Sequence, residues 1–298
     1  MIASPGLARR RYLDELFLGR RFLGTRRQEN AEQFPNLAVF AFDTVSAEVM
    51  VSGRFERTIL DASFTFLGPF ASSFAQGAAL DVGANIGNHA IYFAEHFAEV
   101  HAIEASELPF ALLEVNAKLY GRGRVRPICK GLSDKTETLA FIQKPGEVGS
   151  SYFAEQADDR GSGQVINVAT MPGDDLLRDI APAHPIRLIK VDVEGFELRV
   201  LRGLEATIQQ HRPIILLEQL APDILNGTSE AVDYLRDRCG YTAIFHADTP
   251  SPWRNNRLAI IHRMIFGEET IVRRQLSLAK RHYPLLICLT EEHLSGLD

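Results

Sequence analysis

Short apolar runs alternate with helix-like segments between about residue 77 and residue 247. One such segment, residues 108–120, places Phe110, Leu113 and Ala117 on one face. A strand, a helix and a second strand joined in this way form a right-handed crossover, which makes the strands parallel. The pattern predicts an α/β protein with a mainly parallel sheet, whose ligand lies at the carboxyl ends of the strands. The expected strands are residues 78–82, 100–105, 124–132, 187–194 and 213–220.

Residues 1–76 are expected to form an N-terminal extension of mixed structure. Residues 39–43 and 47–53 have the composition of strands, and residues 55–67 that of a helix. The arginine-rich segment at the start of the chain predicts a short amphipathic helix. It lacks the uninterrupted apolar core of a signal peptide.

Composition excludes several classes of protein. The net charge of −6 provides no general attraction for nucleic acid. No run reaches the roughly 18 apolar residues of a membrane span. Cys129, Cys239 and Cys288 are too widely spaced for a zinc motif, and their low number suits a reducing compartment. We therefore expect a cytoplasmic protein without a membrane span or a nucleic-acid partner; the sequence does not indicate an oligomeric state.

The stretch ALDVGANIGNH, residues 79–89, places a glycine-containing loop between a strand and a helix. Gly83 and Gly87 permit a positive φ and a close approach of the backbone to a ligand. The free N–H groups at the start of the helix favour an anionic group. Asp81 instead suits an ammonium group, so the loop fits the two charges of an amino acid. A simple turn between strand and helix is the alternative interpretation.

Glu104 ends the next expected strand, 23 residues after Asp81. An acid in this place can accept hydrogen bonds from both hydroxyls of a ribose. Dinucleotide-binding proteins share this acid, but GANIG has the pattern GxNxG and lacks the GxGxxG spacing of a nicotinamide-binding loop. A ligand with a ribose and an amino-acid zwitterion fits better, and S-adenosylmethionine has both.

Acids also end the third and fourth expected strands. Asp134 can accept a hydrogen bond from an adenine amine, or it can form an Asx turn or a helix cap. Asp192 and Glu194 alternate along the fourth strand, so both are expected on the face that meets the ligand. Lys190 shares that face, so a structural cluster of ion pairs is the alternative to a functional pair of acids.

Several blocks of the sequence together resemble one known family. They are LDVGANIGNHAIYFA, VHAIEAS, LLEVNAKL, GLSD, LIKVDVEGFELRVLRGL and IILLE. From about Leu80 to Glu218 the chain resembles the FkbM family of S-adenosylmethionine-dependent methyltransferases, and DVEGFELRVLRG is the most specific block. DTVSAEVMVSGRFER resembles the segment that often precedes this domain.

The resemblance implies a Rossmann-like class I methyltransferase fold. Its mostly parallel sheet would have seven strands, an antiparallel last strand pair and helices on both faces. Residues 77–298 would form the methyltransferase domain, and residues 1–76 an extension that caps the acceptor. The implied reaction is methyl transfer, usually to a hydroxyl of a sugar, glycan or secondary metabolite.

The resemblance also assigns the cofactor contacts to residues at the strand ends. The glycine loop would contact the methionine part, Glu104 the ribose and Ser133–Asp134 the adenine. The family often has a proline after the ribose acid, whereas this chain has Ala105. The expected cofactor-binding residues are Asp81, Gly83, Ala84, Asn85, Gly87, Asn88, Glu104, Ala105, Ser133, Asp134 and Asp192.

Methyl transfer to a hydroxyl requires a group that removes the hydroxyl proton as the new bond forms. Glu194 is the preferred candidate because it is expected nearest to the pocket mouth, and Asp192 is the second. His89 opens the helix after the glycine loop and is a further candidate, with a surface histidine as its alternative interpretation. Carboxylates at this edge could instead hold magnesium or manganese, which the sequence favours less.

The acceptor is a hydroxylated small molecule or glycan that the core motifs do not identify. Its expected contacts are the first 76 residues, a glycine-rich lid at residues 145–163 and Trp253 with Arg254 and Arg257. The lid has disorder as its alternative. Two other classes of protein stay open: a module that binds an adenosyl ligand without turnover, and a nicotinamide-dependent oxidoreductase, which the loop spacing disfavours.

Overall fold

The computed structural model describes residues 33–41, 43–144, 151–153, 163–248 and 270–297. The expected helix at the start of the chain and Trp253, Arg254 and Arg257 lie outside these residues. The chain divides into two compact units, residues 1–57 and 58–298. The predicted boundary at residue 76 lies shortly before the first strand, and the predicted division into an extension and a methyltransferase domain stays a prediction.

In the first unit, the strand predicted at residues 47–53 is wrong, because helix α3 (Thr44–Ser52) occupies that segment. The described residues of the strand predicted at 39–43 belong to no strand. The side chain of Asp43 accepts a hydrogen bond from Val45 N at 2.9 Å, and Gly53 ends the helix in the left-handed conformation. An N-cap and a glycine C-cap therefore outweigh the β propensity of the valines between them.

The second unit begins with the helix predicted at residues 55–67, which is confirmed as α4 (Arg57–Phe66). A short 3₁₀ helix, η2 (Gly68–Phe70), and α5 (Ala71–Ala75) lead from it into the first strand.

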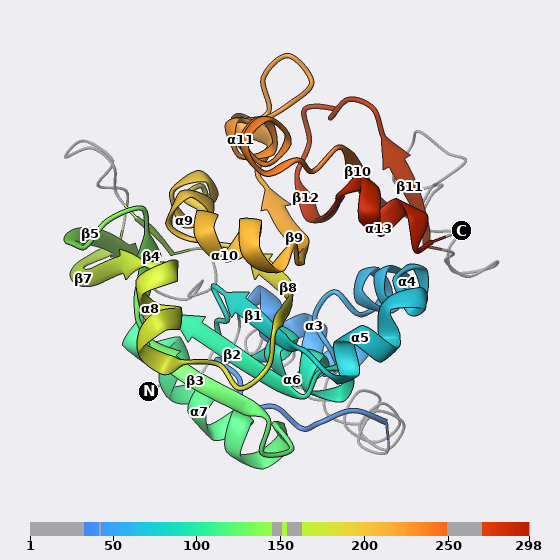
Figure 1. The fold of residues 1–298 in the computed structure, drawn as a ribbon. Helices are drawn as coiled ribbons and strands as arrows, with labels where there is room; N and C mark the ends of the chain where they lie inside the picture. Colours follow the sequence, from blue (N-terminus) through green and yellow to red (C-terminus); the bar gives the residue numbers. More distant parts are fainter. Residues whose placement is uncertain (1–32, 42, 145–150, 154–162, 249–269, 298) are drawn as a thin grey trace, which may run out of the picture. The chain divides into compact units, whose positions relative to one another are not determined.

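The main sheet has the order β11-β10-β12-β9-β8-β1-β2-β3 (Figure 1). The neighbours from β9 to β3 are parallel, whereas β12 is antiparallel to both β9 and β10. The Rossmann-like class is confirmed, but the sheet has eight strands, because β11 adds to β10 at the edge. The strands are β1 (Ala78–Val82), β2 (Glu99–Glu104), β3 (Val125–Cys129), β8 (Ile186–Val191), β9 (Ile214–Gln219), β10 (Ala243–Asp248), β11 (Ile271–Gln275) and β12 (Tyr283–Leu289).

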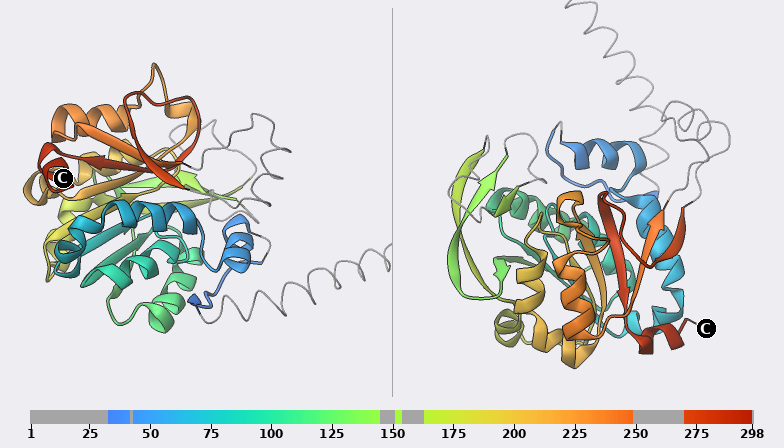
Figure 2. Two further views of the ribbon diagram at one scale, coloured as in Figure 1. Left: turned by 90° about the vertical axis from the view of Figure 1, so that its right-hand side faces the viewer. Right: turned by 90° about the horizontal axis from the view of Figure 1, so that it is seen from above.

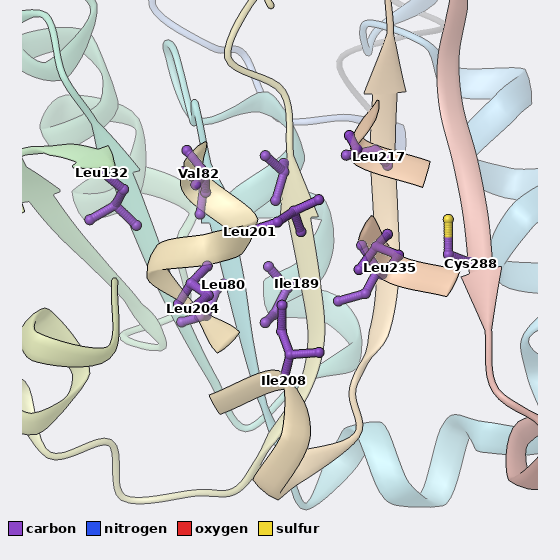
Figure 3. Close-up of a cluster of buried hydrophobic side chains, with 14 of the residues drawn as sticks. Leu80, Val82, Leu132, Ile189, Leu201, Leu204, Ile208, Leu217, Leu235 and Cys288 are labelled. Atoms are coloured by element: carbon purple, nitrogen blue, oxygen red, sulfur yellow. The ribbon is translucent and has the colours of Figure 1, made fainter. Parts of the chain in front are cut away.

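Helices cover both faces of this sheet, as predicted. One face packs against α8 (Gly173–Ile180), α9 (Glu197–Gly203), α10 (Glu205–His211) and α11 (Glu230–Cys239). Figure 3 shows Leu201, Leu204 and Ile208 of this layer over β1 and β8. Cover on both faces explains why the central strands are continuous apolar runs.

The opposite face packs against α4, α5, α6 (Asn88–His96) and α7 (Glu107–Tyr120). Phe64, Phe93 and Leu113 lie in this cluster together with Leu188 and Leu216 of the sheet. The successive residues Leu188 and Ile189 thus belong to opposite cores, as expected of a strand. The short elements η4 (Ala221–Asp223) and α13 (Glu291–Ser295) complete the described fold.

A second sheet lies beside the main one, and the sequence did not predict it. Its order is β4-β7-β5-β6, and β5 pairs antiparallel with β7 and β6. Figure 1 shows β4, β5 and β7 on the same side of the main sheet as its edge strand β3, and Figure 2 gives two further views. The strands are β4 (Gly131–Ser133), β5 (Glu137–Gln143), β6 (Tyr152–Phe153) and β7 (Gln164–Pro172).

The single strand predicted at residues 124–132 is therefore wrong. Lys130 N donates to the carbonyl of Glu104, which is the end of the pairing between β2 and β3. The chain then pairs with β7 from Gly131, where a Cβ would lie 2.9 Å from Thr170 Cγ2. Of the predicted lid, the structure describes only residues 151–153, which include β6, and residue 163. The other residues of the predicted lid lie outside the described part.

Candidate functional site

A hollow of about 630 Å³, counting its open mouth, lies at the carboxyl ends of β1, β2 and β8. The second sheet contributes Phe141 and Phe153 to its wall, and Ser151, just before β6, lies beside them. Six of the predicted site residues line it: Gly83, Asn85, Glu104, Ala105, Asp192 and Glu194.

The glycine loop packs directly against the end of β8. Gly83 has a φ of 79°, and a Cβ there would lie 1.7 Å from the carbonyl oxygen of Asp192. The N–H groups of Gly83 and Ala84 both donate to Ile103 O at 3.0 Å. Gly87, with a φ of 89°, begins α6 beside Leu113. Only glycine fits at residue 83, because any side chain would meet the neighbouring backbone.

Two backbone N–H groups hold the carboxylate of Glu104. One oxygen accepts from Asn85 N at 2.9 Å and the other from Ser106 N at 2.8 Å. Burial raises the pKa of this carboxyl to about 7, although these hydrogen bonds and Lys190 act in the opposite direction. The orientation of Glu104 at the wall of the hollow is therefore set before any ligand binds.

The ammonium of Lys190 joins the ends of β1 and β8. Its Nζ lies 3.2 Å from Asp81, 3.0 Å from Asp192 and 3.3 Å from the carbonyl oxygen of Gly83, and its side chain is only 2% exposed. This is the cluster of ion pairs that the sequence allowed. Asp81 is buried and does not line the hollow, whereas the side chain of Asp192 is 28% exposed and does.

Asp192 and Glu194 line one hollow, but not by alternating along a strand as predicted. Asp192 N donates to Val82 O at 3.1 Å, and β8 has already ended at Val191. Glu194 has a left-handed φ of 55° in the turn that follows. The carboxylate of Glu197 fixes this turn by accepting from Val193 N and Gly195 N. A turn, not the pleat of a strand, therefore brings the two acids together.

Burial raises the pKa of Glu194 to about 7, and the charge of Asp192 contributes to the rise. Lys144 acts in the opposite direction. A carboxyl with this pKa can accept and release a proton near neutral pH.

The remaining predicted residues do not line this hollow. Asp134 accepts from Ser133 Oγ at 3.1 Å and pairs with Arg199 at 2.7 Å. His89 is only 5% exposed, so its interpretation as a surface histidine is wrong. The predicted ligand contacts of these residues stay predictions. The set comprises Asp81, Ala84, Gly87, Asn88, His89, Ser133 and Asp134.

Sequence reasoning missed an acid beside Asp192. Glu218 is the last residue but one of β9, and burial together with the charge of Asp192 raises its pKa far above the ordinary value. His282 Nε2 lies 2.8 Å from Glu218 Oε1. An acid at the end of the apolar run IILLE was the available signal. No signal in the sequence pointed to Phe141 and Phe153, because they reach the hollow from a sheet that was not predicted.

The described residues contain no group of three or more His, Cys, Asp or Glu side chains arranged to hold a metal ion. Within the same residues, no helix has the length and apolar character needed to cross a membrane.

Comparison with known proteins gives a consistent result. Residues 81–243, more than half of the chain, match the family model of the methyltransferase FkbM domain. Hexuronic acid methyltransferase AglP of Haloferax volcanii is 32% identical over 136 residues, 46% of this chain and 53% of that protein. The match thus spans about half of that relative. Methyltransferase sdnD of Sordaria araneosa is 26% identical over 236 residues, 68% of this chain and 88% of that protein.

Among solved structures, the crystal structure of a methyltransferase FkbM from Methylobacillus flagellatus aligns with 15% identity and a TM-score of 0.39. The alignment covers 81% of this chain and 58% of that one.

The close packing of the glycine loop predicts a stability difference between two alanine variants. Gly123 also has a positive φ, of 69°, but no atom lies within 4 Å of the Cβ position. Gly123→Ala therefore adds only backbone strain, about 1–2 kcal/mol. Gly83→Ala adds a clash with backbone as well, so it should lose about 2 kcal/mol more. Urea unfolding of both variants measures the difference, and equal losses would contradict the contact.

A second prediction concerns the dependence of stability on pH. Burial raises the pKa of Glu197 to about 7 from its ordinary value of 4.5. The folded chain therefore keeps this proton at pH values where the unfolded chain has lost it, and stability falls as pH rises from about 4.5 to about 7. Glu197→Gln keeps an oxygen for Val193 N and Gly195 N but cannot ionise. It should escape about 2–3 kcal/mol of this loss.

Urea unfolding of wild type and Glu197→Gln at several pH values between 4.5 and 8 tests this. The other buried acids titrate in both proteins, so the difference between the two curves isolates Glu197. A difference that does not change with pH would contradict the prediction.

Proposed function

The chain belongs to the family of FkbM methyltransferase domains, and we propose that it moves a methyl group from S-adenosylmethionine to a hydroxyl oxygen of a sugar-like acceptor. The family match supports the methyltransferase class. One observation carries the choice of donor: the fixed carboxylate of Glu104 lies in the same hollow as the glycine loop and the acids after β8.

The residues at the hollow fit this donor. Each oxygen of Glu104 accepts one backbone N–H and keeps a lone pair, so the carboxylate can also accept from ribose hydroxyls. Asn85 and Gly83 supply close backbone for the methionine part. Because Lys190 neutralises Asp81, we assign the cofactor's ammonium to the exposed side of Asp192.

S-adenosylmethionine, when bound, supplies a methyl group on a positively charged sulfur that an oxygen nucleophile attacks in line. Glu194 is the proposed base, since its carboxyl faces the hollow and has a pKa of about 7. Phe141 and Phe153, whose ring centroids lie 5.0 Å apart, cover part of the same wall and exclude water from it.

A sugar-like acceptor is supported by the relative from Haloferax volcanii, which is named a hexuronic acid methyltransferase. A glycan or a small hydroxylated metabolite has the same reacting group. Of the two competing classes, the family match leaves little support for a nicotinamide-dependent oxidoreductase. A module without turnover is disfavoured by the carboxyl of Glu194, which is poised to move a proton.

The donor assignment predicts the effect of removing the ribose acid. Glu104→Ala should weaken binding of S-adenosylmethionine by roughly 2–4 kcal/mol, because it removes charge-assisted bonds to two hydroxyls. Glu107→Ala removes an exposed acid at the start of α7 and is the matched control. Titration calorimetry on the folded variants measures both. Unchanged affinity in Glu104→Ala, or tight binding of NAD by the wild type, would contradict the assignment.

The base assignment predicts a loss of rate without a loss of cofactor. Glu194→Gln keeps the shape of the side chain and should bind S-adenosylmethionine nearly as wild type does. Its turnover should fall by roughly 10²–10⁴, the usual contribution of a positioned acid–base group. Glu230→Gln, at an exposed residue of α11, is the control. Methyl transfer to a panel of sugars, followed by mass spectrometry, measures the rate; wild-type turnover in Glu194→Gln would exclude it as the base.

A further inference from the structure

A row of polar side chains runs from the hollow to the surface beyond the residues assigned above. Lys190 Nζ contacts Asp192, Asp192 and Glu218 follow a residue pair of β8 and β9, and His282 Nε2 lies 2.8 Å from Glu218 Oε1. Lys190 is buried, whereas the side chain of His282 is 49% exposed. The row therefore joins the inside of the site to solvent.

Strand topology places these residues together. Val191 pairs with Leu217, so the next residues, Asp192 and Glu218, lie side by side where β8 and β9 end. On the other side of β9, Gln219 pairs with Tyr283, which follows His282 directly. Three neighbouring strands thus deliver the row to one edge of the sheet.

Two adjacent carboxyl groups are more stable when they share a proton, because two neighbouring carboxylates repel each other. Lys190 stabilises the negative charge on Asp192, which leaves the proton with Glu218: the pKa of Asp192 is lowered despite its burial, and that of Glu218 is raised. The charged or titratable groups that face this pair are Lys190, Asp81, His89, Glu194, Glu197 and His282.

We propose that Asp192, Glu218 and His282 form a path by which the proton removed from the acceptor leaves the site. This inference rests on the proposed methyl transfer. In that reaction the O–CH₃ bond forms, the S–CH₃ bond breaks and the acceptor oxygen loses one proton, which Glu194 takes. Glu194 must give that proton up before the next turnover.

The proton transfers along this row of side chains are balanced. The proton passes from Glu194 to Asp192 through a water molecule in the hollow that both acids line. Glu218 then gives a proton to His282 Nε2, and Asp192 returns its proton to Glu218. The imidazolium releases its other N–H proton to solvent, so one proton leaves per methyl group and both carboxylates are restored.

Glu218 and His282 act through Glu194 and Asp192, so their variants should affect turnover rather than binding. In His282→Ala the steady-state rate should fall about tenfold, less than the loss of a positioned acid–base group would cause. The single-turnover rate and the affinity for S-adenosylmethionine should stay within about twofold of wild type. Added imidazole should restore the rate of His282→Ala but not that of Glu218→Gln, where the path is cut further in. His184→Ala, at a residue that does not line the hollow, is the control.

A steady-state rate of His282→Ala equal to that of wild type, or a loss that imidazole does not restore, would overturn the path. So would rescue of Glu218→Gln by imidazole.

An infrared measurement separates failure of the path from failure of the proposed function. At about pH 9 the carboxyls with a pKa near 7 are ionised, whereas Glu218 keeps its proton. Wild type should show the carbonyl stretch of a protonated carboxyl that Glu218→Gln lacks. Absence of this band overturns the path whether or not methyl transfer occurs. Presence of the band without methyl transfer to any acceptor supports the shared proton and refutes the proposed reaction.

Discussion

The site depends on one buried charge, the ammonium of Lys190. Its contacts with Asp81, Asp192 and the carbonyl oxygen of Gly83 join two parallel strands at their carboxyl ends. A buried ammonium is stable only with partners, and a buried carboxylate likewise. Lys190 therefore requires the acids, and each acid requires Lys190. Because Gly83 is held in the same cluster, the position of the glycine loop follows from the pairing.

The balance of charge also decides which acids are available to a ligand. Lys190 neutralises Asp81 and part of Asp192, so Glu104 and Glu194 are left in the hollow with pKa values near neutrality. The backbone at these two acids is also unusual. Asn85, whose N–H donates to Glu104, and Glu194 itself both have a positive φ although neither is glycine. Strain of this kind persists where the surrounding structure holds a residue in place, and it concentrates at functional sites.

The strand ends could be predicted because their signals are local. The apolar run before Glu104 and the spacing of Gly83 and Gly87 lie within a few residues of the features that they determine. The second sheet could not be predicted, because a single residue, Lys130, lies between β3 and β4 in the sequence. Only its hydrogen bond to Glu104 O marks where the pairing with β2 ends. Helix α3 was missed since a valine-rich segment has β propensity, whereas its capping by Asp43 depends on side-chain geometry. Glu218 was overlooked because its partners come from β8 and from the segment before β12.

The wall formed by Phe141, Ser151 and Phe153 has a different origin from the rest of the hollow. Glu104, Gly83 and Asp192 are tied to the main sheet and to one another, so a substitution among them disturbs several contacts at once. The second sheet contributes its side chains from a hairpin-like pairing of β5 with β6 and β7, outside the main ladder. A substitution in that wall therefore changes the shape offered to an acceptor while leaving the contacts of the charged half of the site in place.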